Sequence, residues 1–211
     1  MSRGRFITLE GGEGVGKSTQ SHLLGAALEA RGVRVIQTRE PGGTPGAEAV
    51  RALLLGRQTD WSPQAESLLF AAARANHVDE VIRPALERGD WVICDRYLDS
   101  SRAYQGGEGG LGDADILSLH AIGSQGLLPD RTLLLEADDD QVRIRLAARD
   151  GDNSDRIGGR PADYHRKVAL RFAAFTEAEP ERFARIEAAG TPQEVHTRIM
   201  AVLTPLLQAH R

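Results

Sequence analysis

The chain has few of the residues from which many extracellular, metal-binding or membrane proteins are built. Cys94 is the one cysteine in 211 residues, which excludes a disulfide framework and a thiolate metal cluster. No apolar run approaches the roughly 18 residues that a membrane span requires. A strand pattern begins within a few residues of the N-terminus, so we expect no signal peptide. These absences favour a cytoplasmic protein without membrane contact, in which Cys94 is a buried structural thiol.

A basic excess is also missing. The net charge is −4, which argues against a general nucleic-acid binder. Lysine is nearly absent. Of the 26 lysine and arginine residues, only Lys17 and Lys167 are lysines, and twenty-four are arginines. The six histidines lack a metal-ligand spacing such as H-E-x-x-H. With 41% apolar and 27% charged residues, the composition is that of one ordinary globular domain, which we expect to span 1–211.

Short apolar runs alternate with helical patterns along the chain. Such runs indicate an α/β fold with a five-stranded parallel sheet that helices cover on both faces. The expected strands are Phe6–Leu9, Val33–Thr38, Trp91–Cys94, Thr132–Glu136 and, with a weaker pattern, Phe183–Ile186. Helices are expected at Thr19–Ala30 and at about 45–55, 113–125, 138–149, 161–178 and 192–209.

A longer helix is expected after Ser62, which has the side chain of an N-cap and precedes Pro63 at the first helical position. It should run to about Arg88 and stop at Gly89, with Pro84 bending its last turns.

A complete G-x-x-x-x-G-K-[ST] phosphate-binding loop lies between the first strand and the first helix. Its residues are Gly11, Gly12, Glu13, Gly14, Val15, Gly16, Lys17 and Ser18, followed by Thr19. The glycines let backbone N–H groups approach phosphate oxygens, and the helix N-terminus adds its positive end. Lys17 should reach the β- and γ-phosphates, and the Ser18 hydroxyl should ligate Mg²⁺. The alternative, a glycine-rich turn with an incidental lysine, is disfavoured in a chain with so little lysine.

Three further features point to a second, phosphate-bearing substrate. Asp95 and Arg96 follow a strand, where ligands of open α/β sheets bind, and suit Mg²⁺ and a phosphate respectively. Arg39 precedes a Pro-Gly-Gly turn at the end of another strand. Phe70 and Arg74 lie four apart on the long helix, which suits a flat heterocycle. Each feature alone has a plainer explanation: a helix-capping pair, a charged turn, and a core phenylalanine beside a solvated arginine.

Together these segments resemble the thymidylate kinases, in particular their bacterial branch, over nearly the whole chain. The likeness is carried in order by Leu9–Ser18, Arg39-Glu40-Pro41-Gly42-Gly43-Thr44, Leu69–Arg74, Asp95-Arg96-Tyr97, Ser100–Gly107, Pro129-Asp130 and Asp155-Arg156-Ile157. The resemblance implies a P-loop NTPase fold, a homodimer, and transfer of the γ-phosphoryl group of ATP to dTMP with Mg²⁺.

The same resemblance assigns roles around dTMP. Phe70 stacks on thymine, Arg74 bonds a base carbonyl, and Ser101 meets the base edge. Tyr104 lies under the deoxyribose and disfavours a 2′-hydroxyl. The remaining expected substrate contacts are Arg39 and Arg96 on the phosphate, Glu13 on the sugar and phosphate side, and Ser100 and Gln105 in the same segment as Ser101.

A lid is expected from about Arg143 to Arg160, with Arg145, Arg149 and Arg156 as catalytic cations beside Lys17 and Arg96. Part of the family carries an arginine inside the P-loop, whereas this chain has Glu13 there, so the catalytic cation should come from the lid. Family members commonly continue Asp-Arg-Ile with Glu, where this chain has Gly158. Asp163 is a candidate substitute.

Two alternatives stay open at this point. One is a kinase for another nucleoside monophosphate, such as dUMP, CMP or GMP. The other is a P-loop GTPase or regulatory nucleotide-binding module, although the chain has no N-K-x-D guanine motif.

Overall fold

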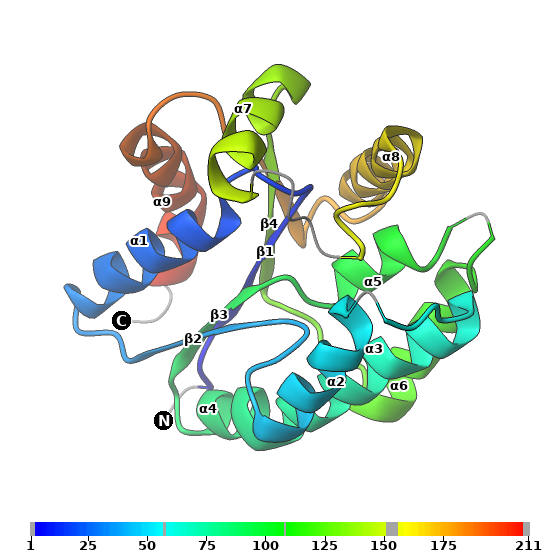
Figure 1. The fold of residues 1–211 in the computed structure, drawn as a ribbon. Helices are drawn as coiled ribbons and strands as arrows, with labels where there is room; N and C mark the ends of the chain where they lie inside the picture. Colours follow the sequence, from blue (N-terminus) through cyan, green and yellow to red (C-terminus); the bar gives the residue numbers. More distant parts are fainter. Residues whose placement is uncertain (1–2, 57, 108, 151–155, 209–211) are drawn as a thin grey trace.

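A five-stranded, fully parallel sheet forms the centre of the molecule (Figure 1). The computed structural model describes residues 3–56, 58–107, 109–150 and 156–208, and only the backbone of Asp139 and residues 146–150. The strands are β1 (Phe6–Glu10), β2 (Val35–Arg39), β3 (Trp91–Asp95), β4 (Arg131–Glu136) and β5 (Phe183–Glu187). Their order is β2-β3-β1-β4-β5, which confirms the predicted α/β fold and all five predicted strands.

Both faces of the central strands are buried, which explains their continuous apolar runs. Successive side chains alternate between the two faces. Ile7 and Leu9 of β1 belong to one core cluster, and Phe6 belongs to another on the opposite face. Thr8 shares the face of Phe6 and donates a hydrogen bond from its Oγ1 to Oγ1 of Thr132 in β4, over 3.0 Å. The hydrogen-bonding requirement of the buried Thr8 hydroxyl is therefore met by a side chain of the neighbouring strand.

Two helices cover the face to which Ile7 and Leu9 point. They are α1 (Lys17–Glu29) and α9 (Pro192–Gln208), which lie together on the left of Figure 1. Leu24 and Leu28 of α1 and Ile199 of α9 are fully buried in this cluster.

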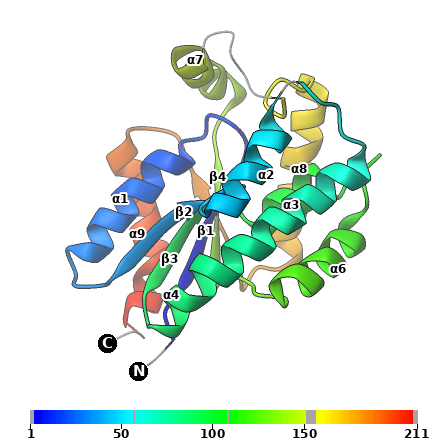
Figure 2. The same cartoon turned by 60° about the horizontal axis from the view of Figure 1, so that its bottom comes forward.

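Five further helices lie on the opposite face of the sheet. They are α2 (Pro45–Leu55), α3 (Pro63–His77), α5 (Leu98–Tyr104), α6 (Asp113–Ser124) and α8 (Ala162–Ala178). Figure 2 shows α2, α3 and α6 as a group, with α3 between the other two. Helix α7 (Asp139–Asp150) follows β4 and projects beyond the carboxyl edge of the sheet.

The predicted long helix has three segments. Ser62 is its N-cap, and the Ser62 Oγ accepts a hydrogen bond from the Ala65 N–H over 3.2 Å, as expected. The helix continues from α3 into a π-helical turn, η1 (Val78–Ile82), and ends in α4 (Arg83–Glu87) before Gly89. Pro84 is the second residue after η1, and its missing N–H accounts for the change in the hydrogen-bond pattern.

Helix α5 is not among the helices predicted from the sequence. This helix has only seven residues, too few to be stable alone in water. Polar contacts hold its first turn instead. The carboxylate of Glu10 accepts hydrogen bonds from the Tyr97 N–H and the Ser100 hydroxyl over 2.8 and 2.6 Å. Asp99, fully buried, accepts two from the guanidinium of Arg182, which precedes β5.

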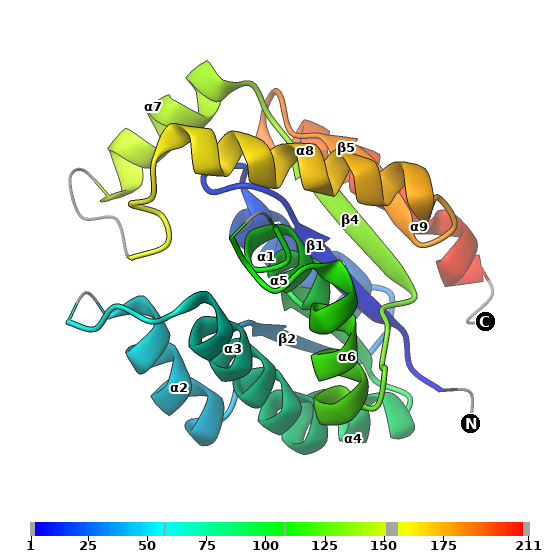
Figure 3. The same ribbon diagram turned by 90° about the vertical axis from the view of Figure 1, so that its right-hand side faces the viewer.

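The carboxyl ends of the parallel strands point toward one open edge of the molecule. Figure 3 shows α7 and the start of α8 on one side of this edge, and α2 with the N-terminal end of α3 on the other. None of the described helices is long and apolar enough to cross a membrane.

Candidate active site

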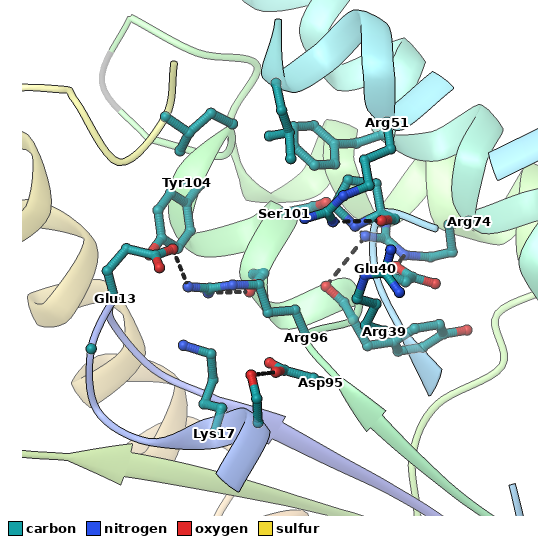
Figure 4. A pocket seen from close by; sticks show the side chains of 18 of the residues that line it. Glu13, Lys17, Arg39, Glu40, Arg51, Arg74, Asp95, Arg96, Ser101 and Tyr104 are labelled. Atoms are coloured by element: carbon teal, nitrogen blue, oxygen red, sulfur yellow. Dashed lines mark hydrogen bonds and ion pairs between the residues drawn. The ribbon is translucent and has the colours of Figure 1, made fainter. Parts of the chain in front are cut away.

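A pocket of about 530 Å³ lies at the carboxyl edge of the sheet, where Figure 4 shows charged side chains from several elements pointing toward one another. The P-loop, the ends of β2 and β3, helices α2, α3 and α5, and the segment predicted to form a lid all contribute to its lining. The lining residues are Glu13, Gly14, Gly16, Lys17, Ser18, Thr19, Arg39, Glu40, Pro41, Arg51, Leu55, Phe70, Arg74, Asp95, Arg96, Tyr97, Ser100, Ser101, Tyr104, Gln105, Arg145 and Ile157.

The P-loop needs glycine at two positions for different reasons. At Gly11 a Cβ atom would lie 2.4 Å from the carbonyl oxygen of Leu135, so a side chain would collide with β4. Gly16 has a φ of 98° in the left-handed region and is the N-cap residue of α1. Gly11, Gly12 and Val15 do not line the pocket. They shape the loop, and Val15 is buried in the core below it.

Lys17 begins α1 and lies almost buried in the pocket, with 7% of its surface exposed. Its ammonium donates hydrogen bonds to the carbonyl oxygens of Gly12 and Gly11, over 2.6 and 3.3 Å. Burial, with the nearby charge of Arg96, lowers the pKa of Lys17 to about 8, although Glu13 and Asp95 partly oppose this. The ammonium is therefore a poorly hydrated charge that favours an anionic ligand.

Ser18 and Asp95 meet across the sheet edge. The Ser18 hydroxyl donates a hydrogen bond to Oδ2 of Asp95 over 2.6 Å. A hydroxyl and a carboxylate at this distance offer the hard oxygen ligands that Mg²⁺ prefers. Among the described residues no group of three or more His, Cys, Asp and Glu side chains could hold a metal. Mg²⁺ does not need one, because it commonly uses one or two protein oxygens with substrate phosphates and water.

Arg96 lies in the middle of the pocket, between the P-loop and α5. Its φ is 68°, an unusual conformation for a residue with a side chain, and it sits directly after β3. The guanidinium donates to the Gly11 carbonyl, to the Ser100 hydroxyl and, over 2.6 Å, to Glu13. It also lies 5.2 Å from the centre of the Tyr104 ring. Burial lowers the pKa of Arg96, but Tyr104, Glu13 and nearby acids outweigh it and raise the pKa.

A buried carboxylate lies behind Arg96. Glu10 ends β1, is fully buried and accepts the two hydrogen bonds from Tyr97 and Ser100 described above. Burial, together with the charge of Asp99, raises the pKa of Glu10 to about 7. Ser100 therefore connects Glu10 to Arg96, and we infer that it positions the guanidinium.

Arg74 is held by a network at the far end of the pocket from Lys17. Its Nε donates to Glu40 over 2.8 Å, and its Nη2 donates to the Ser101 hydroxyl over 2.7 Å. The second oxygen of Glu40 pairs with Nδ1 of His77 at 3.1 Å. Burial raises the pKa of Glu40, but Arg74 and His77 together outweigh it and lower the pKa. The guanidinium of Arg74 is thus fixed in orientation before any ligand binds.

The pocket contains every substrate contact expected from the sequence. Phe70 lies one turn before Arg74 on α3, and Ser101, Tyr104 and Gln105 come from α5 and the residue after it. Arg39 ends β2 and donates to both carboxylate oxygens of Glu48, with about half of its side chain exposed.

Two residues that line the pocket were not predicted from the sequence. Arg51 and Leu55 line the pocket from α2, and Nη1 of Arg51 donates to the Pro41 carbonyl over 2.7 Å. A signal was present, because Arg51 shares a helix face with Ala47 and Leu54, which are fully buried. Glu40 was quoted only as part of a motif, yet it orients Arg74.

The three lid arginines differ in position. Arg145 of α7 lines the pocket and donates to the carbonyl oxygens of Val15 and Ala188. The side chain of Arg149 and all of Asp155 lie outside the described residues. Arg156 lies away from the pocket lining, with its guanidinium on Glu66 and the Leu54 carbonyl. Asp163 is exposed on α8, pairs with Arg166 and lines a different cleft.

Comparisons with known proteins agree with this geometry. Residues 9–199 match the family model for thymidylate kinase. The chain is 58% identical to the thymidylate kinase of Rhizorhabdus wittichii over 97% of its own length and 99% of that protein. It is 52% identical to the thymidylate kinase of Clavibacter sepedonicus over 91% and 90% of the two chains. The crystal structure of the thymidylate kinase from Ehrlichia chaffeensis superposes with a TM-score of 0.77 and 32% identity, over 95% and 99% of the two chains. The chain belongs to the thymidylate kinase family of phosphotransferases.

Proposed function

We propose that this chain transfers the γ-phosphoryl group of ATP to dTMP, and that the residues gathered in the pocket carry out the transfer. The observation that carries the proposal is the continuity of the pocket. Lys17 of the P-loop and Phe70 and Arg74 of α3 line the same pocket. The Lys17 end suits a triphosphate, and the end with Phe70 and Arg74 suits a flat base. The phosphoryl donor and the phosphoryl acceptor can therefore meet between these two ends.

The acceptor end fits thymidine monophosphate. Phe70 offers an aromatic plane for stacking on the base, and Arg74 offers hydrogen-bond donors for a base carbonyl. Tyr104 lies below the sugar position, with its ring against Arg96. Arg96 and Arg39 bind the monophosphate, and Glu13 faces the sugar and phosphate from the P-loop. Arg51 adds a further cation to this end of the pocket.

The donor end fits ATP with Mg²⁺. The loop from Gly11 to Thr19 surrounds the β- and γ-phosphates, and Lys17 neutralises charge on the transferring group. Ser18 and Asp95 would hold Mg²⁺, which neutralises phosphate charge when bound. Removal of divalent metal with EDTA should abolish turnover, and Mg²⁺ should restore it. Asp95→Asn should raise the Mg²⁺ concentration needed for half-maximal activity.

The transfer makes little covalent demand on the protein. The attacking oxygen of dTMP is already anionic, so a strong general base is not needed. Lys17 and Arg145 face the region where charge develops, and charge stabilisation there lowers the barrier. Closure of the lid would exclude water, which otherwise competes as the acceptor.

A homodimer is the proposed assembly, through the outer surface of α3 and α6. Leu68 of α3 and Leu117 and Ile122 of α6 are 54%, 38% and 82% exposed on two helices that lie side by side (Figure 2). Large apolar side chains that are exposed on neighbouring helices favour a protein contact. Analytical ultracentrifugation should show a dimer, and Ile122→Glu should shift it toward the monomer. A monomeric parent at micromolar concentration would contradict the assembly. With these soluble nucleotide substrates, we place the enzyme in the cytoplasm.

A coupled assay of ADP release tests the function. The enzyme is supplied with ATP and Mg²⁺, alone or with dTMP, dUMP, CMP or GMP. We expect turnover to depend on the acceptor and to be fastest with dTMP. The preference over dUMP should be modest, because one methyl group in an apolar pocket is worth about 1–3 kcal/mol. Equal ADP release with and without dTMP would contradict the proposal, and a faster reaction with CMP or GMP would reassign the acceptor.

A further inference from the structure

A buried carboxylate outside the pocket lining ties the lid to the acceptor side. Glu66 lies in the first turn of α3 and is 3% exposed. Its Oε2 accepts hydrogen bonds from Nη2 of Arg156 and from Nη2 of Arg160, each over 2.6 Å. Its Oε1 accepts one from Nε2 of Gln105 over 2.9 Å. One carboxylate thus joins two arginines of the lid segment to Gln105, a residue at the acceptor end of the pocket.

The position of Glu66 on α3 relates it to the residues that contact the base. Glu66, Phe70 and Arg74 follow one another at intervals of four, so they lie along one side of the helix. Phe70 and Arg74 line the pocket, whereas Glu66 lines the neighbouring cleft of about 460 Å³. Tyr104 and Gln105 border both spaces. Glu66 therefore belongs to the wall behind the base-binding end.

The contact with Glu66 fixes the amide of Gln105. An ionised carboxylate only accepts hydrogen bonds, so the NH₂ group of Gln105 must face it. The carbonyl oxygen of the amide is then directed away from Glu66, where it can accept a hydrogen bond from a ligand. A flipped amide would present a donor in its place and would place two acceptors against each other.

The two arginines fix the lid segment in the same way. Arg156 also donates from its Nε to the Leu54 carbonyl at the end of α2, over 2.9 Å. Ile157, the next residue, is 7% exposed and lines the acceptor end of the pocket, as Leu55 does. Because the side chains of Arg156 and Arg160 are only 13% and 24% exposed, loss of the Glu66 charge would leave two guanidiniums close together without the carboxylate that they share.

We propose that Glu66 is a positioning residue that couples the lid to acceptor binding. It orients the Gln105 amide toward the base, and it holds Ile157 over the acceptor pocket through Arg156 and Arg160. Glu66 does not touch the substrate. The inference deepens the proposed function and rests on dTMP binding at the Phe70 end of the pocket.

The test compares Glu66→Gln with Asp113→Asn. Asp113 binds Nε and Nη2 of Arg102 over 2.8 and 3.0 Å, and it lies outside both clefts. It is therefore a control for the loss of a carboxylate bound to arginine, at a side chain that is 43% exposed. We expect Glu66→Gln to raise the KM for dTMP at least tenfold, with the KM for ATP within about twofold. Asp113→Asn should leave both constants near those of the parent.

Hydrogen–deuterium exchange supplies a second readout. In the parent, dTMP alone should slow exchange in the peptide that contains 156–161. In Glu66→Gln the same peptide should exchange faster, and dTMP should protect it less. If Glu66→Gln does not fold, Arg160→Gln replaces it, because that side chain is partly exposed and should be tolerated.

The outcomes separate the two hypotheses. If the parent neither binds nor phosphorylates dTMP, the proposed function fails. If the parent uses dTMP but the folded Glu66→Gln variant behaves like Asp113→Asn, only the coupling role of Glu66 is overturned. Equal increases in the KM values for dTMP and ATP would likewise overturn it, because they indicate a general structural loss.

Discussion

The ammonium of Lys17 lies 2.6 Å from the carbonyl oxygen of Gly12, so the P-loop lysine is hydrogen-bonded to its own loop. Phosphate oxygens would compete for the same ammonium. We expect Lys17→Ala to lower kcat by several orders of magnitude without unfolding the protein, because an interaction with the transferring group matters most in the transition state. The chain offers its own control, since Lys167→Ala removes the other lysine. Near-normal turnover in a folded Lys17→Ala variant would exclude Lys17 from the mechanism.

The lowered pKa of Lys17 predicts a pH dependence. Below pH 8 the ammonium is charged, and above a pKa of about 8 the free enzyme carries a neutral amine. The kcat/KM for ATP, which reports on the free enzyme, should therefore fall as the pH rises through 8. Bound phosphates stabilise the ammonium, so kcat should fall only at higher pH. A kcat/KM that stays constant between pH 7 and 9.5 would contradict this assignment.

Arg74 should govern the acceptor and not the donor. Removal of a hydrogen bond from a charged donor costs about 1.5–3 kcal/mol, so Arg74→Ala should raise the KM for dTMP roughly ten- to a hundredfold. The KM for ATP should change little. Because the variant leaves the Glu40 carboxylate without its arginine, its melting temperature should also fall. Kinetics must be measured well below that temperature. An unchanged KM for dTMP would show that Arg74 only supports the fold.

Tyr104 should determine the sugar preference. The ring lies against the Arg96 guanidinium at the position proposed for the deoxyribose. Tyr104→Ala should lower the ratio of kcat/KM for dTMP to that for the ribonucleotide. Tyr104→Phe keeps the ring and tests the hydroxyl separately. If neither variant changes the ratio, the ribose is rejected elsewhere in the pocket.

Among the lid arginines, Arg145 should have the largest effect on kcat. It lines the pocket near the P-loop, whereas Arg156 is bound to Glu66. An arginine that reaches the transition state is worth about 10³–10⁵ in kcat, while a screened surface charge is worth little. Arg145, Arg149 and Arg156 are each changed to Ala, with both substrates at saturation. If all three variants stay within about threefold of the parent, or roughly 0.7 kcal/mol, the lid does not supply the catalytic cation.

The sequence predicts the sheet and the P-loop because both follow from local patterns. Continuous apolar runs mark buried parallel strands, and the glycine spacing marks a loop that must avoid β4 at Gly11. The short helix α5 escapes prediction because its stability comes from Glu10 and Arg182, which lie far away in sequence. The apolar face of α2 indicates which side of that helix is buried, but only the folded structure shows that Arg51 on this side lines the pocket.

The π-helical turn η1 has a similar explanation. Pro84 predicts a disturbance at this point, but not where the helix absorbs it. The turn leaves α3 regular from Pro63 to His77, so Phe70 and Arg74 keep their helical spacing.

Residues outside the pocket stabilise α5, the helix that carries two of the pocket residues. Ser101 and Tyr104 face the pocket, yet their helix depends on a buried ion pair between Asp99 and Arg182, neither of which lines the pocket. A natural variant at Arg182 would touch neither nucleotide. It would remove two hydrogen bonds from Asp99 and weaken the support of the helix that carries Ser101 and Tyr104, so the evolutionary constraint on this enzyme should extend beyond the residues that line the pocket.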